Sequence, residues 1–391
     1  MMILYTQEKD CCGCTACMTV CPKKAIEMKT DAKGFAYPEL DLSLCVECGL
    51  CEKACAFQNG YCTEENLPEP QIYAVQHLDE QERATSRSGG MFAALCKWFF
   101  DEMNGVVYGV GYEEHFRAVH KRAENQKEAF EFKGSKYVQS DMGDIFSQVR
   151  EDLKAGRNVL FSGTPCQTAG LRSALCSVNT DNLYVCDIVC HGTPSPVVWE
   201  DYLTMQEKKN HSKAVQVDFR DKSQLGWTLH FESVTFENGT KIIDEIYTDL
   251  FYKHIMLRPS CENCKYTNFQ RPSDITLADF WGIGKAVPEM NDNKGVSLIL
   301  VNTPKGEHMF QAVEDKIRYK ESTKEKCMQP NLKQPSVFSG QTDAFWKDYL
   351  AHGFEYAAKK YGILNFKGRL KFRLKMRLKH KVQVKQKGAG V

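Results

Sequence analysis

The stretch CCGCTACMTVCP at residues 11–22 decides the fold of the N-terminal part of this chain, because it spaces four cysteines as Cys-x2-Cys-x2-Cys-x3-Cys-Pro. The stretch CVECGLCEKAC at residues 45–55 repeats the cysteine spacing. Four thiolates in this pattern ligate one 4Fe-4S cluster, since the short loops direct three sulfurs at one cube of iron and sulfide. Zinc sites more often present two separated Cys-x2-Cys pairs. The sequence therefore predicts two 4Fe-4S clusters near the N-terminus.

The two runs together are typical of a two-cluster ferredoxin-type domain, which we place at residues 1–64. In such domains the fourth cysteine of each run ligates the other cluster. We therefore group Cys55 with the first three cysteines of the first run, and Cys21 with the first three of the second. Cys12 falls outside the register, and we expect no special role for it. The predicted ligands are Cys11, Cys14, Cys17, Cys21, Cys45, Cys48, Cys51 and Cys55.

Cysteine is abundant, with 18 residues in a chain of 391. Residues 1–10 show no basic start followed by an apolar stretch, and no apolar run approaches the roughly 18 residues of a membrane span. In a reducing cytosol, clustered cysteines hold metal more often than they form disulfides. We therefore expect a cytoplasmic protein, with a peripheral place at the inner membrane face as an option that its C-terminal tail raises.

The net charge of +1 conceals a basic tail, which we assign to residues 365–391. From residue 367 to residue 387, basic residues alternate with apolar ones and no acidic residue occurs. An extended tail would be basic on one side and apolar on the other, whereas a helix would carry Leu370, Leu374 and Leu378 as an apolar stripe. Attachment to an anionic membrane surface or an acidic partner is one interpretation, and a solvated tail is the other. No nucleic acid partner is expected, because no aromatic stacking platform accompanies the charge.

The rest of the chain divides by its pattern. Residues 66–70 form a linker stiffened by two prolines. From residue 71 strand and helix patterns alternate, and residues 215–247 then show three successive strands with a hairpin turn. We assign residues 71–330 to this larger domain and residues 331–364 to a C-terminal helical segment. The predicted fold class is a mixture of α+β and α/β: a small ferredoxin-like N-terminal domain, followed by a larger mixed-sheet domain covered by helices.

Four further cysteines lie at predicted strand ends or in loops, namely Cys166, Cys190, Cys261 and Cys264. Because loops at strand ends converge in space, these four thiols are candidates for one site. Four thiolates would complete a third 4Fe-4S cluster. Spacing alone leaves a zinc site or a redox-active thiol pair open as alternatives.

Four stretches of this body resemble signatures of the beta-subunit family of coenzyme F-420 hydrogenases and dehydrogenases. They are GSKYVQS at 134–140, SGTPCQTAGL at 162–171, VCHGTPSP at 189–196 and DITLADFWGI at 274–283. The resemblance extends from about residue 72 to residue 301, with the ferredoxin-type domain as an N-terminal addition. It implies an FAD flavoprotein with a body cluster on the four cysteines above, which exchanges electrons among clusters, flavin and a soluble substrate. It does not select that substrate.

Three segments are candidates for holding the flavin, since no G-x-G-x-x-G fingerprint follows a strand. A helix predicted to begin near Ser88 would present free N–H groups to a phosphate, although plain capping by Ser88 is the alternative. The turn at residues 134–137 could contact a phosphate or the ring system, or be an ordinary turn. The third segment lies at the mouth of a strand. The candidate residues are Arg87, Ser88, Gly89, Gly90, Ser135, Lys136, Tyr137, Gly163 and Thr164.

His191 follows a proposed cluster ligand and is the candidate catalytic residue, as a proton donor to a reduced substrate. The alternative is a hydrogen bond that fixes the Cys190 loop. We expect an iron–sulfur flavin-dependent oxidoreductase that passes electrons between a ferredoxin-like donor and a small soluble molecule. A non-enzymatic electron-transfer protein is one alternative. An accessory protein of surface-polysaccharide biosynthesis, anchored by its basic tail, is another.

Overall fold

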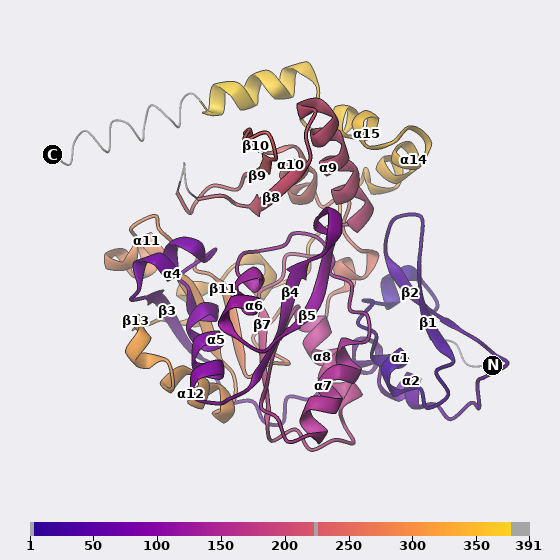
Figure 1. The fold of residues 1–391 in the computed structure, drawn as a ribbon, viewed down its shortest axis with the longest axis vertical. Helices are drawn as coiled ribbons and strands as arrows, with labels where there is room; N and C mark the ends of the chain where they lie inside the picture. Colours follow the sequence, from indigo (N-terminus) through magenta and orange to yellow (C-terminus); the bar gives the residue numbers. More distant parts are fainter. Residues whose placement is uncertain (1–3, 223–225, 377–391) are drawn as a thin grey trace.

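The computed structural model describes residues 4–222 and 226–376 and shows a small N-terminal module beside a larger body (Figure 1). The module is an antiparallel hairpin with three short helices next to the two cysteine runs. This arrangement and the mixed sheet of the body confirm the predicted fold class. The module's elements are α1 (Ala16–Val20), β1 (Ile26–Thr30), β2 (Ala36–Leu40), α2 (Leu50–Lys53) and α3 (Ala56–Asn59).

The body is built on one eight-stranded mixed sheet. Its strands are β3 (Gln71–His77), β4 (Val106–Tyr112), β5 (Ala118–Ala123), β6 (Val159–Gly163), β7 (Leu183–Ile188), β11 (Ile275–Asp279), β12 (Ser297–Val301) and β13 (Ile317–Glu321). Their spatial order is β13-β3-β12-β11-β7-β6-β4-β5. The four strands β4, β6, β7 and β11 pair in parallel, and the outer strands pair antiparallel. The central parallel strands are buried on both faces, which explains their continuous apolar sequences.

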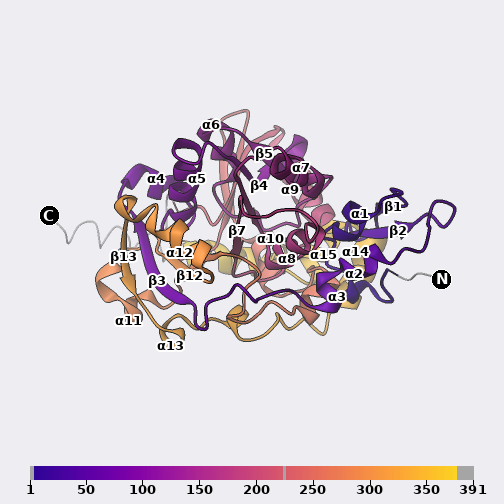
Figure 2. The same cartoon turned by 90° about the horizontal axis from the view of Figure 1, so that it is seen from below.

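Helices cover both faces of this sheet (Figures 1 and 2). Because side chains alternate along a strand, Val107 and Leu160 face one side while Val106 and Val159 face the other. The first pair packs with α5 (Met91–Asp101) and α12 (Pro304–Gln311). The second pair packs with α7 (Ile145–Lys154), and α8 (Pro165–Ala174) lies on that same face.

The start of α5 corrects the sequence prediction. The helix begins at Met91 rather than near Ser88, and Gly90 is its N-cap with a φ of 93°. Ser88 does not cap it, since its hydroxyl donates to the carbonyl of Val296 at 2.8 Å. The segment before Gly90 stays close to the sheet, where the N–H of His77 donates to the carbonyl of Gly89 at 2.7 Å. A Cβ at Gly89 would lie 2.0 Å from the Val75 carbonyl oxygen, so strand packing alone requires this glycine.

A separate three-stranded antiparallel sheet confirms the predicted hairpin region. It contains β8 (Ala214–Phe219), β9 (Glu232–Phe236) and β10 (Lys241–Asp244), with β9 in the middle. The third strand is shorter than predicted, because α10 (Ile246–Tyr252) begins directly after it. An aromatic core joins this sheet to α9 (Pro196–Asn210), α14 (Thr342–His352) and α15 (Phe354–Lys360).

The basic tail begins as a helix over residues 366–376, which lies beside the small sheet (Figure 1). Of the two predicted conformations, the helix is therefore found for these residues; residues 377–391 lie outside the described part of the chain. Among the residues that the structure describes, no helix combines the length and the apolar character that crossing a membrane requires.

One buried arginine makes several of the hydrogen bonds between the module and the body, beside those of Arg150 with Thr19 and Ser195 with Lys33. The guanidinium of Arg258 donates to the carbonyls of Cys11 and Ala36 at 2.9 Å each, and to the side-chain oxygen of Gln139 at 3.0 Å. It also lies 4.4 Å from the ring centroid of Tyr37 and is 1% exposed. One side chain thus ties the first cysteine run and the hairpin of the module to the body.

Replacing Arg258 tests this fastening. In Arg258→Met, two module carbonyls lose a charged donor, which should lower the free energy of unfolding by about 3 kcal/mol and expose the linker at residues 60–70. Urea unfolding and limited proteolysis of the reconstituted protein measure both effects. The exposed module residue Lys23 supplies the control variant Lys23→Met, which should behave as wild type. Unchanged stability and cleavage in Arg258→Met would contradict the assignment.

Candidate functional site

The cysteines of the N-terminal module form two groups. Cys21, Cys45, Cys48 and Cys51 line one cavity and are called the outer quartet below. This is the crossed grouping that the sequence predicts, since Cys21 comes from the first run. Backbone N–H groups point at two of its sulfurs: Ala25 donates to Cys21 at 3.3 Å and Glu47 to Cys45 at 3.4 Å. Hydrogen bonds of this kind are typical around iron–sulfur ligands.

The inner quartet consists of Cys11, Cys14, Cys17 and Cys55. Burial, followed by the neighbouring thiols Cys14, Cys11 and Cys55, raises the pKa of Cys17. Burial likewise raises the pKa of Cys11 to about 11, with Cys14 and Cys55 adding to the increase. These mutual effects place the four thiols close together, with Cys55 supplied by the second run.

Both cysteine runs have left-handed backbone conformations at the same positions between their cysteines. Gly13 and Thr15 have φ values of 71° and 67°, and the corresponding Glu47 and Gly49 have values of 52° and 72°. Such left-handed residues turn the chain sharply. The repeated spacing in the sequence therefore corresponds to a repeated loop geometry.

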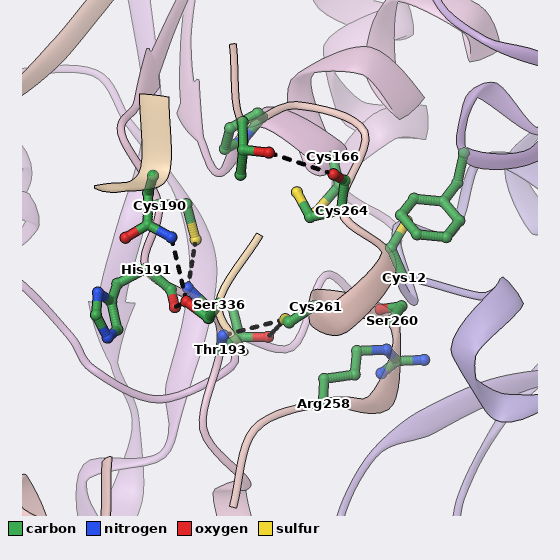
Figure 3. A pocket seen from close by; sticks show the side chains of 15 residues that line it. Cys12, Cys166, Cys190, His191, Thr193, Arg258, Ser260, Cys261, Cys264 and Ser336 are labelled. Atoms are coloured by element: carbon green, nitrogen blue, oxygen red, sulfur yellow. Dashed lines mark hydrogen bonds between the residues drawn. The ribbon is translucent and has the colours of Figure 1, made fainter. Parts of the chain in front are cut away.

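The four predicted body cysteines come together from three different parts of the chain (Figure 3). Cys166 is the second residue of α8, Cys190 follows β7, Cys261 lies in a 3-10 helix at Pro259–Asn263, and Cys264 follows that helix. We call them the body quartet. They line one cavity whose wall also includes Cys12.

Polar groups of the surrounding loops face these sulfurs. The N–H of Gly192 donates to Cys190 and the N–H of Thr193 to Cys261, both at 3.4 Å. The hydroxyl of Thr164 lies 3.2 Å from the sulfur of Cys166. Four thiols in a buried cavity with N–H donors fit a 4Fe-4S cluster by their donor chemistry. Gly163 and Thr164 accordingly lie beside the body quartet rather than with the other flavin candidates.

Within residues 4–222 and 226–376, no three Cys, His, Asp or Glu side chains stand close enough to hold a single metal ion. A four-iron cluster makes a different demand on its ligands, because each thiolate binds its own iron atom.

Cys12 lies between the inner and body quartets, although its place outside the cysteine register predicts no role for it. Its thiol is within hydrogen-bonding reach of both Cys14 and Cys166, and these contacts raise the pKa of Cys12 and lower that of Cys166 to about 7. It is buried in one apolar cluster with Phe57 and Tyr266. Its only signal in the sequence is its place beside a ligand within a Cys-Cys pair.

His191 points away from the body quartet (Figure 3). Its Nε2 lies 2.7 Å from Nε2 of His254, whose Nδ1 lies 2.7 Å from the carbonyl of Val337. A neutral His254 that donates to this carbonyl leaves its Nε2 as an acceptor, so Nε2–H of His191 is the donor of the pair. Burial, reinforced by His254, lowers the pKa of His191 to about 4. These contacts fix the loop that carries Cys190.

Two of the predicted flavin segments meet in a cluster of basic residues. We define this basic cluster as Arg87, Lys136, Arg220 and Lys222; the last two had no signal in the sequence. Arg87 pairs with Asp218. Arg220 pairs with Asp279, and its guanidinium donates to the hydroxyl of Tyr137 at 3.4 Å.

The lysines of the basic cluster find backbone carbonyls as partners. Lys136 donates to the carbonyl of Lys133 at 3.0 Å, and Lys222 to that of Arg83 at 2.7 Å. Burial, to which the charge of Arg87 adds, lowers the pKa of each lysine to about 7. The cluster therefore holds more positive charge than its surroundings neutralise.

Two donors of the basic cluster are unsatisfied. In the part of the chain that the structure describes, the buried Nε atoms of Arg87 and Arg220 have no hydrogen-bond partner. Buried donors are normally satisfied, so these atoms and the excess charge fit an anionic ligand such as a diphosphate. Gly89 and Gly90 pack closely against the sheet and a side chain of β3.

A row of rings connects the body quartet to the basic cluster. The ring of His191 lies 5.3 Å from that of Tyr252, which lies 5.2 Å from His230. His230 lies 5.1 Å from Trp281, and the guanidinium of Arg220 lies 4.8 Å from the Trp281 ring. The two sites are thus neighbours across one layer of aromatic side chains.

Two family models match this chain. Residues 10–59 match the 4Fe-4S dicluster domain, and residues 156–326 match the C-terminal part of the coenzyme F420 hydrogenase/dehydrogenase beta subunit. One of the subunits of the F(420)H(2) dehydrogenase of Methanosarcina mazei is 23% identical over 193 residues, which cover 47% of this chain and 54% of that protein. The chain therefore matches about half the length of this curated relative.

Among solved structures, a chain of the F420-reducing [NiFe] hydrogenase complex from Methanosarcina barkeri aligns with a TM-score of 0.46 and 15% identity. The alignment covers 75% of this chain and 91% of that one. The family matches confirm the resemblance drawn from the four motifs. The chain thus contains a segment similar to a 4Fe-4S dicluster domain and a second segment similar to the C-terminal part of the coenzyme F420 hydrogenase/dehydrogenase beta subunit.

Proposed function

We propose that this chain is an iron–sulfur flavoprotein oxidoreductase that exchanges electrons with a ferredoxin-like partner at its N-terminal module and with a small soluble substrate in its body. The order of the sites is the observation that carries the proposal. Cys12 joins the inner quartet to the body quartet, and the row of rings from His191 joins the body quartet to the basic cluster. When bound, 4Fe-4S clusters exchange single electrons, and FAD couples them to two-electron chemistry.

The basic cluster supplies what a dinucleotide phosphate needs. The guanidinium groups of Arg87 and Arg220 each have an unused Nε donor, and planar guanidinium groups bind phosphate oxygens well. Lys136 and Lys222 add charge beside them. The stacked pair Trp227 and Trp281, at 5.1 Å and 8°, lies against the same cluster and offers a flat surface for a ring system.

Among the proposed redox sites, the outer quartet is the one that a partner protein can reach. Cys48 is exposed, and four neighbouring apolar side chains are 43% to 58% exposed. These are Leu42, Leu44, Val46 and Leu50. Exposed apolar groups around a redox site support the docking of a protein partner. A non-enzymatic electron-transfer protein would also need this docking surface. It would differ from the proposed flavoprotein because it would bind no flavin.

An iron, sulfide and flavin assay after anaerobic reconstitution tests the proposal. We expect about twelve iron atoms, from three four-iron clusters, and one FAD per chain. Cys166→Ala should retain about eight iron atoms, while the buried Cys327, remote from all three quartets, gives the control Cys327→Ala with full iron content. About eight iron atoms in the wild type would refute the body cluster. Clusters without flavin would favour the non-enzymatic electron-transfer protein.

The bridging position of Cys12 predicts a change in two reduction potentials. A thiol that donates to a cluster ligand stabilises the extra negative charge of the reduced state, so Cys12→Ala should lower the potentials of the inner and body clusters and leave the outer one unchanged. Redox titration followed by electron paramagnetic resonance measures all three. Cys12→Ser should restore the wild-type potentials. Three unchanged potentials in Cys12→Ala, with iron content intact, would contradict the bridge.

The lysines of the basic cluster predict the pH dependence of FAD binding. Each lysine binds an anion only when protonated, and its pKa of about 7 in the free protein is low. The Kd for FAD should therefore be constant below about pH 7 and rise above it, by up to about tenfold per pH unit for each lysine.

Titration calorimetry with FAD from about pH 6 to about pH 9 follows this transition. The variant Lys136→Met/Lys222→Met should bind FAD more weakly and with a flatter pH profile. Lys127 is an exposed lysine of α6 (Gln126–Ala129), and Lys127→Met should keep the wild-type profile. A wild-type Kd that does not change over this range would refute the role of the two lysines.

A further inference from the structure

The helix at residues 366–376 has two faces with different surroundings. Its inner face is fixed to the small sheet, where the buried ring of Phe372 packs edge-on against Phe231 at 5.7 Å. On the same side Arg369 pairs with Asp244, and Lys375 pairs with Glu245. The sequence suggested an acidic partner for the tail. For Arg369 and Lys375, that partner is a pair of carboxylates of the same chain.

The outer face carries an apolar stripe. Phe366, Leu370 and Leu374 follow one another at intervals of four residues and are 83%, 48% and 50% exposed. Residues four apart lie above one another on a helix, so the three side chains form one continuous row. The contacts of Phe372, Arg369 and Lys375 already hold the helix in place, and the stripe contributes nothing to that docking.

Basic residues border the stripe on both sides. Lys367 and Lys371 flank it on one side and Arg373 on the other, all three exposed. From residue 366 to residue 391 the sequence contains no Asp or Glu, and five further Lys or Arg follow residue 376. The nearest carboxylates on the small sheet, Asp244 and Glu245, are engaged by the inner face.

We propose that this outer face binds the surface of an anionic lipid bilayer. An apolar row bordered by ammonium and guanidinium groups has the charge and polarity pattern of the boundary between acyl chains and phosphate headgroups. A soluble polyanion would pair with the basic residues and leave the apolar row in water. The docked inner face would hold the body against the membrane in one orientation. This inference is independent of the proposed redox chemistry.

Vesicle co-sedimentation of the full-length reconstituted protein tests the proposal. We expect binding to vesicles of equal parts phosphatidylglycerol and phosphatidylcholine, little binding to pure phosphatidylcholine, and weaker binding at high salt. Leu370→Glu/Leu374→Glu should lose at least about tenfold in binding, because it places charge in the inserted row while leaving every docking contact intact. Lys367→Gln/Lys371→Gln should weaken binding to the anionic vesicles alone.

A matched control separates the stripe from added charge in general. Val215 and Leu350 are 51% and 53% exposed elsewhere on the body, so Val215→Glu/Leu350→Glu should bind the vesicles as wild type does. Unaltered iron content and circular dichroism confirm that each variant is folded. Equal binding to both lipid compositions would overturn the proposal. So would wild-type binding by Leu370→Glu/Leu374→Glu, or equally tight binding of DNA or polyglutamate that this variant keeps.

Discussion

One buried cation, Arg258, contacts the inner quartet at Cys11 and lines the cavity of the body quartet. Arg258 is 1% exposed and donates its hydrogen bonds to carbonyl and amide oxygens, and within the described residues it forms no ion pair with a carboxylate. That charge acts on thiols of two quartets: the hydrogen bond with Cys12 is the main cause that lowers the pKa of Cys14 and Cys166, and Arg258 adds to it, while at Cys11 Arg258 opposes the effect of burial. Buried thiolates need such compensation. Arg258 is therefore both a fastening between module and body and a counter-charge for the sites on either side of it.

The sequence predicted the parts of the site that depend on local spacing. The eight N-terminal cysteines could be proposed as ligands because each cysteine loop is short and its geometry is set by neighbours, as the matching left-handed residues Gly13 and Glu47 show. The main strands and helices followed from apolar periodicity. The roles of Cys12 and Arg258 could not be identified, because each depends on a partner more than a hundred residues away in the chain, Cys166 for Cys12 and Gln139 for Arg258. The packing of α8 against α1, where Gly170 touches Cys14, helps to bring the two cysteine sites together.

The basic cluster shows a different limit of sequence reasoning. Arg87 and Lys136 stand in glycine-containing segments that look like phosphate loops, whereas Arg220 and Lys222 follow a strand with no such signal. The prediction assigned the glycines to phosphate binding, whereas the structure gives Gly90 a packing reason as well: a Cβ there would lie 2.8 Å from the His77 side chain, so the neighbouring strand shapes the helix start. A glycine-containing segment of this kind suits a phosphate-binding loop, and it equally suits the close packing of two backbone segments. Only the tertiary contacts distinguish them.

The conformation of the tail is decided by the residues of the body that it contacts. Its alternating basic and apolar residues fit a strand with two faces as well as a helix with one stripe. The helix prevails where Asp244 and Glu245 at the end of β10 meet basic residues six positions apart, Arg369 and Lys375. Phe372, midway between them, closes the contact against Phe231. Once these three side chains fix the rotation of the helix, Leu370 and Leu374 must face outward, because they lie on the opposite side of the same helical turns.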